Sequence, residues 1–418
     1  MLPLGSFGVP DPLCNQARSD DKDTPDIERW LLDMMTQSDY TDFWRSEPLW
    51  QVGEHVDEFV DIPALFMGSW YDVCRADTFF PLLAGKSASR KLIMGPWVHI
   101  DFEQVSGDVD FGETAALPRS EYMALQKRWF DATLKGDGDA FLREPPVRIF
   151  VMGGGSGRRT AAGHLEHGGS WRDETTWPLA DVSYEEFYLG RGGELTWDLP
   201  SADGRASSYR YDPDDPVPTT GGTAFFFRDR ERDAFDLFVP LGPHDHRAVQ
   251  GSNLSGADGR VDVLSFQTAP LREAVEVTGP LAAEIWLSAT TADTDLTVKL
   301  LDVYPSSDDY PDGYAMNLSD GLLRLRYRDS FESPTLLTPG TIYKVEVPSD
   351  IFGVTSNRFA AGHRIRLDIS SSNFPAFDRN PNNGTMMTHE ESQPVITEVS
   401  IQHNADYPSH VILPIIRR

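Results

Sequence analysis

Asp72 and His99 are the residues of this chain whose types and spacing best fit catalysis. Each directly follows an apolar run with the composition of a strand, residues 62–71 for the acid and 91–98 for the histidine. A histidine can take a proton from a serine hydroxyl, and an aspartate can orient the imidazole and stabilise its positive form. We interpret the pair as the acid and base of a Ser-His-Asp triad. Structural coincidence is the alternative, because turns after strands attract aspartate.

Alternating strands and helices must position this pair. A helix is expected from Asp77 to about Leu83, between the two strands, and another over residues 119–134. A strand-helix-strand order is typical of a parallel sheet, and the loops at the carboxyl ends of such strands converge. The second helix has an apolar set that we expect to supply one apolar face: Met123, Leu125, Trp129, Phe130 and Leu134.

The serine of such a triad should come earlier in the chain, on a G-x-S-x-G turn that follows a strand. The nearest match is Gly5-Ser6-Phe7-Gly8, where Leu4 occupies the first small-residue position and no strand precedes. We therefore interpret Ser6 as a loop serine. The expectation is that this chain lacks the N-terminal part that carries the nucleophile.

Composition limits the partners and the compartment. The 418 residues suffice for two or three domains, and the net charge of −28 argues against nucleic acid or an anionic membrane as a partner. No window is apolar enough for a membrane helix. The two cysteines, Cys14 and Cys74, are too few for a disulfide framework or a zinc cluster. We expect a cytoplasmic protein, and an export signal upstream of Met1 stays an open alternative.

From about residue 144 the pattern changes to short alternating strands separated by Pro, Gly, Asp and Asn. Residues 147–152, 282–288, 296–301 and 365–370 are expected strands, and this spacing is typical of a β-sandwich. The stretch 200–222 is expected to be a surface connection. His244-Asp245-His246 suggests a metal site only weakly, because no third ligand is placed, so we favour a surface turn and predict no metal. Cys74 is expected to be a small buried thiol.

Several motifs, taken together and in order, resemble the X-Pro dipeptidyl-peptidase and cocaine-esterase-like (CocE/NonD) serine hydrolases. The resemblance runs from about residue 40 to the end of the chain. The motifs are GSWYD at 68–72, GPWVH at 95–99, WFD at 129–131 with LKG at 134–136, WRD at 171–173 with WPL at 177–179, DTDL at 293–296, LSDG at 318–321, and SNFP at 372–375 with DRNP at 378–381.

The resemblance implies an α/β plus all-β architecture, with a partial α/β-hydrolase domain followed by a jelly-roll β-sandwich. The implied division is a cap remnant and linker over 1–58, the C-terminal part of the hydrolase domain over 59–143, and the jelly roll over 144–418. Asp72 and His99 match the triad acid and base of the family. The implied activity is hydrolysis of a small ester, amide or short peptide through an acyl-enzyme, without a cofactor.

Three aromatic residues flank the pair, namely Trp70, Tyr71 and Trp97. They are candidates for lining a substrate pocket, and packing beneath the site is the alternative. One subgroup of the family binds an α-amino group through acids just after the triad aspartate. Residues 73–75 carry no acid, which disfavours an amino-acid ester hydrolase. A homo-oligomer is compatible with these features.

Two other functions stay open. The chain could be a non-catalytic β-sandwich binding module, or a pseudoenzyme fragment in which Asp72 and His99 are relics. A row of aromatic side chains on one exposed sheet face would favour binding, and no such row is evident.

Overall fold

The computed structural model of the chain describes residue 37 and residues 39–46, 56–73, 76–82, 85–99, 101–135, 139–202, 204–223, 241–255, 258–385 and 393–418. Ser6, Cys74 and most of the expected cap remnant lie outside these residues. Within them, no helix combines the length and the apolar character that crossing a membrane requires.

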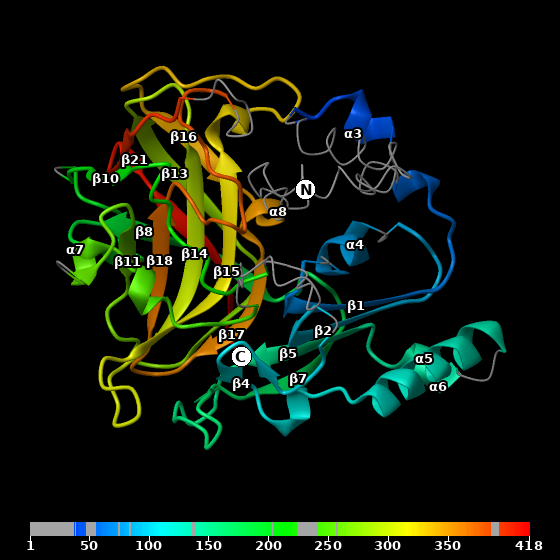
Figure 1. The fold of residues 1–418 in the computed structure, drawn as a ribbon. Coiled ribbons are helices and arrows are strands. Elements are labelled where there is room, and N and C mark those ends of the chain that lie inside the picture. The colour runs from blue at the N-terminus through cyan, green and yellow to red at the C-terminus, as the bar shows by residue number, and fades with distance from the viewer. Residues whose placement is uncertain are drawn as a thin grey trace, which may run out of the picture.

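Three parallel strands form the part of the fold that carries Asp72 and His99. Strand β1 (Ala64–Tyr71) pairs with β2 (Arg90–Val98), and β2 pairs with β5 (Val147–Met152), in each case in parallel. Helix α4 (Ala76–Leu82) lies between β1 and β2 in the chain and contacts both strands. The expected strand-helix-strand order is therefore present, beside the β-sandwich (Figure 1).

Strand β5 joins the parallel strands to the rest of the molecule. It pairs in antiparallel orientation with β7 (Gly169–Glu174), and a single bridge links it to β17 (Val354–Phe359). The domain boundary expected between residues 143 and 144 thus falls between two strands, β2 and β5, that are hydrogen-bonded to each other. The division of the chain at that point stays a prediction.

Helix α5 (Arg119–Leu134) has the expected bounds, but its apolar residues do not share the one face that was expected. Met123, Phe130 and Leu134 are exposed, whereas Trp129 is buried against Phe141 of the short helix α6 (Asp139–Arg143). The apolar residues divide between two sides of the helix, because positions 123, 130 and 134 follow one helical stripe and 125, 129 and 132 another. The expectation of one apolar face is wrong.

The first layer of the β-sandwich is centred on β14 (Asp295–Tyr304). This strand lies between β15 (Tyr314–Arg324) and β18 (Arg364–Ser370), and β18 also pairs with β11 (Leu264–Gln267), all in antiparallel orientation. The strands expected at 296–301 and 365–370 lie within β14 and β18. Almost every residue of β14 is buried, so both of its faces are covered.

The second layer contains the other long strands, and the two layers are linked by hydrogen bonds through β9. Residues 200–222, expected to be a surface connection, include a strand that pairs with β19 and buries Tyr209 and Tyr211. The strands of this layer are β8 (Val182–Gly190), β10 (Ser207–Tyr211), β12 (Val275–Pro280), β13 (Ala282–Ala289), β16 (Tyr343–Val347), β17, β19 (Thr397–Ile401) and β22 (His410–Ile416). The remaining short elements are α3 (Asp42–Ser46), β3 (Val105–Ser106), β4 (Val109–Asp110), β6 (Leu165–Glu166), β9 (Glu194–Thr196), α7 (Ser252–Ser255), α8 (Ser349–Phe352), β20 (His403–Asn404) and β21 (Tyr407–Pro408).

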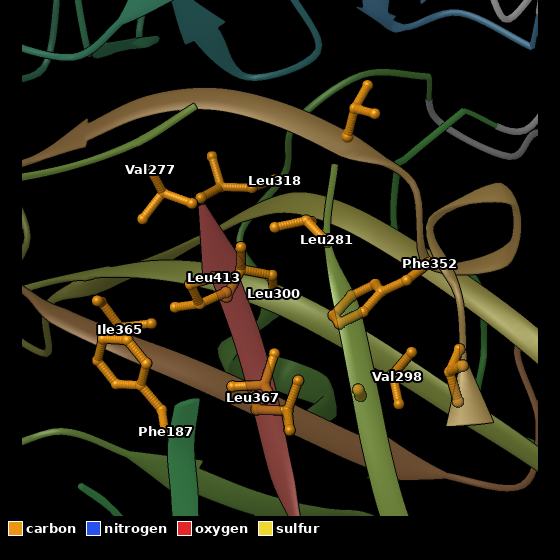
Figure 2. Packing of buried hydrophobic residues seen from close by; sticks show 14 of the residues in the cluster. Phe187, Val277, Leu281, Val298, Leu300, Leu318, Phe352, Ile365, Leu367 and Leu413 are labelled. Atoms are coloured by element: carbon orange, nitrogen blue, oxygen red, sulfur yellow. The ribbon is translucent and has the colours of Figure 1, made fainter. Parts of the chain in front are cut away.

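The main hydrophobic core lies between these layers (Figure 2). Val298 and Leu300 of β14 point into it with Leu367 of β18, and Leu413 of β22 and Phe187 of β8 meet them from the second layer. All five side chains are completely buried. The alternation of apolar residues along β14 and β18 places one face of each strand in this core.

Candidate functional site

Asp72 and His99 lie at the carboxyl ends of two neighbouring parallel strands. Asp72 follows β1 and His99 follows β2, and Asp72 Oδ1 is 2.9 Å from His99 Nδ1. The side chains are 13% and 26% exposed, so water reaches the pair only partly. The structure therefore brings together the two residues that the sequence pattern singled out as candidates for acid and base.

An irregularity in the pairing of β1 with β2 brings the two strand ends level. Ser69 lies opposite Gly95 and Tyr71 opposite Val98, so β2 has one more residue than β1 over this stretch. Such a bulge re-aims the side chains that follow it. A Cβ at Gly95 would be 2.4 Å from the Trp97 ring, so only glycine leaves room for the indole to fold back over the strand.

The three flanking aromatic residues are packed into the fold beside the pair. Trp70, Tyr71 and Trp97 are 3%, 2% and 0% exposed. Their polar atoms donate to backbone oxygens: Trp70 Nε1 to Phe150 at 2.8 Å, Tyr71 Oη to Asn317 at 3.0 Å, and Trp97 Nε1 to Ala115 at 2.7 Å. Burial with a satisfied donor is the pattern of a packing residue. It favours packing beneath the site, and substrate contact by these rings stays a prediction.

The His244-Asp245-His246 run does not form a metal site. His244 Nδ1 is 2.9 Å from Asp108 Oδ2, Asp245 pairs with Arg247, and His246 Nε2 contacts the carbonyl oxygen of Thr220. The three side chains have separate partners, and the described part of the chain contains no group of three His, Cys, Asp or Glu residues placed to hold a metal.

The expectation of a surface turn at this run is wrong. His246 is 2% exposed, and burial, its largest cause, lowers its pKa well below the ordinary value. The run is covered because the segment it belongs to lies against β15, where Asp245 forms a bridge to Met316.

Sequence reasoning did not identify two polar residues that connect the pair to the sandwich. The backbone oxygen of Asn317 in β15 accepts a hydrogen bond from the Tyr71 hydroxyl. The carboxylate of Asp108, in the turn between β3 and β4, forms a hydrogen bond with the His244 ring. Their partners are distant in the chain, so no local spacing could have indicated them.

Two family models match the chain. Residues 139–412 match the X-Pro dipeptidyl-peptidase C-terminal non-catalytic domain, and residues 10–101 match the X-Pro dipeptidyl-peptidase (S15 family). The second match contains both Asp72 and His99.

Individual proteins show the same relationship. The chain is 36% identical over 402 residues to the cocaine esterase of Rhodococcus sp. (strain MB1 Bresler), covering 93% of this chain and 62% of that protein. It is similar to an α-amino acid ester hydrolase of known structure, with 25% identity and a TM-score of 0.70 over 91% of this chain and 59% of the other. The fold also matches an aminopeptidase from a marine sediment Thaumarchaeota archaeon, with 24% identity and a TM-score of 0.71 over 94% of this chain and 61% of the other.

The chain therefore spans about three-fifths of the length of each of these proteins. The match over residues 139–412 alone covers more than half of the chain. On this evidence the chain belongs to the X-Pro dipeptidyl-peptidase family, together with the cocaine-esterase-like hydrolases.

Proposed function

We propose that this chain is part of a serine hydrolase that cleaves esters or amides, with Asp72 as the acid and His99 as the base of its catalytic triad. The observation that carries the proposal is the 2.9 Å contact between Asp72 Oδ1 and His99 Nδ1 at the ends of adjacent parallel strands. Ends of parallel strands are where catalytic groups of α/β enzymes gather. Membership of the family supports the same assignment.

The contact defines what each residue would do. In the neutral imidazole of His99, Nδ1 carries the proton and donates a hydrogen bond to Asp72. The lone pair is then on Nε2, the atom that takes the serine proton. When the serine attacks the substrate carbonyl, the imidazole becomes positive and the Asp72 carboxylate stabilises it. His99 then returns the proton to the leaving alcohol or amine, and water hydrolyses the acyl-enzyme by the same route.

We place the serine, and the donors that stabilise the oxyanion, outside the described residues. The mechanism needs no metal or cofactor. We also propose that the chain contains a partial α/β-hydrolase domain followed by a jelly roll. The parallel strands β1, β2 and β5 support the first, and the two antiparallel layers support the second.

For the substrate, we propose a small ester whose acyl group lacks an α-amino group. The relative at 36% identity is named a cocaine esterase, which supports an ester. The positions directly after Asp72 are Val73, Cys74 and Arg75, so no acid stands there to bind an ammonium group. Because the chain is also similar to an α-amino acid ester hydrolase, hydrolysis of an alanine ester should be measured beside that of a simple ester.

Fluorophosphonate labelling read by intact mass tests the proposal. It should be applied to two preparations. One is the chain alone, and the other is the chain mixed with the part of the Rhodococcus cocaine esterase that lies outside the 62% covered by this chain. We expect one adduct in the mixture, and none when the chain carries His99→Ala. His164→Ala, at a half-buried histidine in the turn before β6, is the matched control and should leave labelling unchanged.

Absence of labelling in both preparations, with the chain folded, would reject the proposal and favour a pseudoenzyme or a binding module. An unlabelled portion of a preparation that reacts with the fluorophosphonate should hydrolyse p-nitrophenyl acetate faster than an alanine p-nitrophenyl ester, and the reverse order would reject the acyl preference. Cytoplasmic location and a homo-oligomeric state stay predictions, to be tested by fractionation and by light scattering.

A further inference from the structure

Tyr71 connects the strand that carries Asp72 to the β-sandwich. It is the last residue of β1, it precedes Asp72 directly, and its ring is buried against Phe111. Its hydroxyl donates to the backbone oxygen of Asn317 at 3.0 Å. Burial, reinforced by the negative charge of Asp302, raises the pKa of Tyr71 well above its ordinary value, so the hydroxyl keeps its proton and remains a donor.

Asn317 lies next to a bulge in β15. Leu300 of β14 pairs with Ser319 and Leu301 pairs with Asn317, so Leu318 is an extra residue and β15 is bulged there. A bulge changes the direction of the backbone next to it, and bulges are frequent beside active sites. Asn317 is 1% exposed, so its position is set by the packing around it.

The turn between β3 and β4, which follows His99 in the chain, is linked to the same residue through His244. Asn317 Oδ1 accepts the backbone N–H of His244 at 2.7 Å, and His244 Nδ1 is 2.9 Å from Asp108 Oδ2. The backbone N–H of Asp108 donates to the carbonyl oxygen of Pro243 at 3.0 Å. Gly107 has a φ of 57°, and a Cβ there would be 2.4 Å from that same oxygen, so the two turns lie against each other without room for a side chain.

One sandwich residue thus contacts Tyr71, which directly precedes Asp72, and, through His244, is linked to the turn at Asp108, nine positions after His99. The acid side reaches Asn317 through the Tyr71 hydroxyl, and the base side reaches it through His244 and Asp108. Since misplacing a catalytic group by about 1 Å can cost about a hundredfold in rate, the distance between acid and base must be fixed by rigid neighbours.

We propose that Tyr71 is a positioning residue of the Asp72–His99 pair, and that the region similar to a C-terminal non-catalytic domain acts on catalysis by holding Tyr71 at Asn317. This inference rests on the proposed function, because it assigns Tyr71 a role in the same site. It predicts that removing only the Tyr71 hydroxyl loosens the contact between Asp72 and His99, although neither residue is changed.

Tyr71→Phe and a matched control, Tyr209→Phe, test this inference on the full chain. Tyr209 is also buried, and its hydroxyl bonds to Ser371 Oγ at 2.8 Å within the sandwich. Each variant loses one buried hydroxyl hydrogen bond, so the two should lose similar stability. The reporter is the downfield proton resonance of His99 Nδ1 in the [15N]histidine-labelled chain, assigned by its loss in Asp72→Asn.

We expect Tyr71→Phe to shift and broaden this resonance and Tyr209→Phe to leave it unchanged. An unchanged resonance in Tyr71→Phe would overturn the inference. Its absence from the wild-type chain would do the same, because Asp72 would then not be held against His99. In a preparation that hydrolyses esters, Tyr71→Phe should lower kcat about tenfold with KM unchanged, the signature of lost alignment.

This experiment separates the inference from the proposed function. If the resonance responds to Tyr71→Phe but no fluorophosphonate adduct forms in any preparation, the proposed function fails and the positioning by Tyr71 stands. If adducts form and depend on His99 while the resonance ignores Tyr71→Phe, the proposed function stands and the inference fails.

Discussion

Replacing Asp72 by Asn should lower the rate of acylation about 10⁴-fold. The substitution keeps the shape of the side chain but removes its charge, so it removes the attraction to the imidazolium that forms in the transition state. Two unit charges 2.9 Å apart interact by about 6 kcal/mol at an effective dielectric constant of ~20. That interaction is absent while His99 is neutral, so nearly all of it acts on the barrier, where each ~1.4 kcal/mol changes the rate about tenfold.

The assay is the rate of p-nitrophenyl acetate hydrolysis, in the preparation that reacts with the fluorophosphonate. KM should change little, because Asp72 does not contact the substrate in this mechanism. Asp101→Asn is the matched control. It makes the same chemical change at an exposed carboxylate two residues after His99, and we expect less than a twofold effect on the rate.

A loss of less than about tenfold in Asp72→Asn would refute the reasoning, because the carboxylate would then not be coupled to the developing charge. An equal loss in Asp101→Asn would also refute it, since the effect would then come from the general negative field and not from the 2.9 Å contact.

Three further predictions concern stability, measured by urea denaturation of the chain. Lys299→Met should lower the free energy of unfolding by about 3–5 kcal/mol, because Lys299 is 4% exposed and its charge compensates that of Asp320. Adding Asp320→Asn should restore most of the loss, and no recovery would contradict the coupling. Burial lowers the pKa of His167, so below about pH 6.5 the unfolded chain binds a proton that the folded chain does not, and stability falls by up to ~1.4 kcal/mol per pH unit. His167→Gln should reduce the slope between pH 7 and 5, with His246, whose pKa burial also lowers, supplying slope that remains, and identical slopes would disprove this cause. Leu300→Ala should cost about 2–5 kcal/mol, because the side chain is fully buried in the core, whereas Leu199→Ala, at a leucine that is 70% exposed, should cost less than about 0.5 kcal/mol.

Local elements could be predicted where an apolar pattern repeats within a short segment. The helix expected over 119–134 and the strands expected at 147–152, 296–301 and 365–370 are α5, β5 and parts of β14 and β18. What the pattern did not predict was which side of a helix is covered. Met123, Phe130 and Leu134 of α5 are exposed, because burial depends on the partner that packs against the helix and not on the helix itself.

The contact between the acid and the base could also be predicted. Neighbouring parallel strands end at the same edge of a sheet, so a residue directly after each strand must lie close to the other. That rule is enough to bring Asp72 and His99 together, and the structure places their side chains 2.9 Å apart. The bulge in β2 beside the close contact of Gly95 with the Trp97 ring could not be foreseen, because the alternation of a single strand does not show where its pairing shifts.

The sequence by itself thus determined several of the strands, the crossover helix and the two catalytic candidates, since each follows from interactions between residues that are near in the chain. Only the tertiary structure decided what surrounds them. Tyr71 donates to an oxygen 246 positions further along the chain, and His244 reaches Asp108 across 136 positions. Such contacts depend on how strands from distant parts of the chain are laid beside one another, and the periodicity of a single segment holds no information about that arrangement.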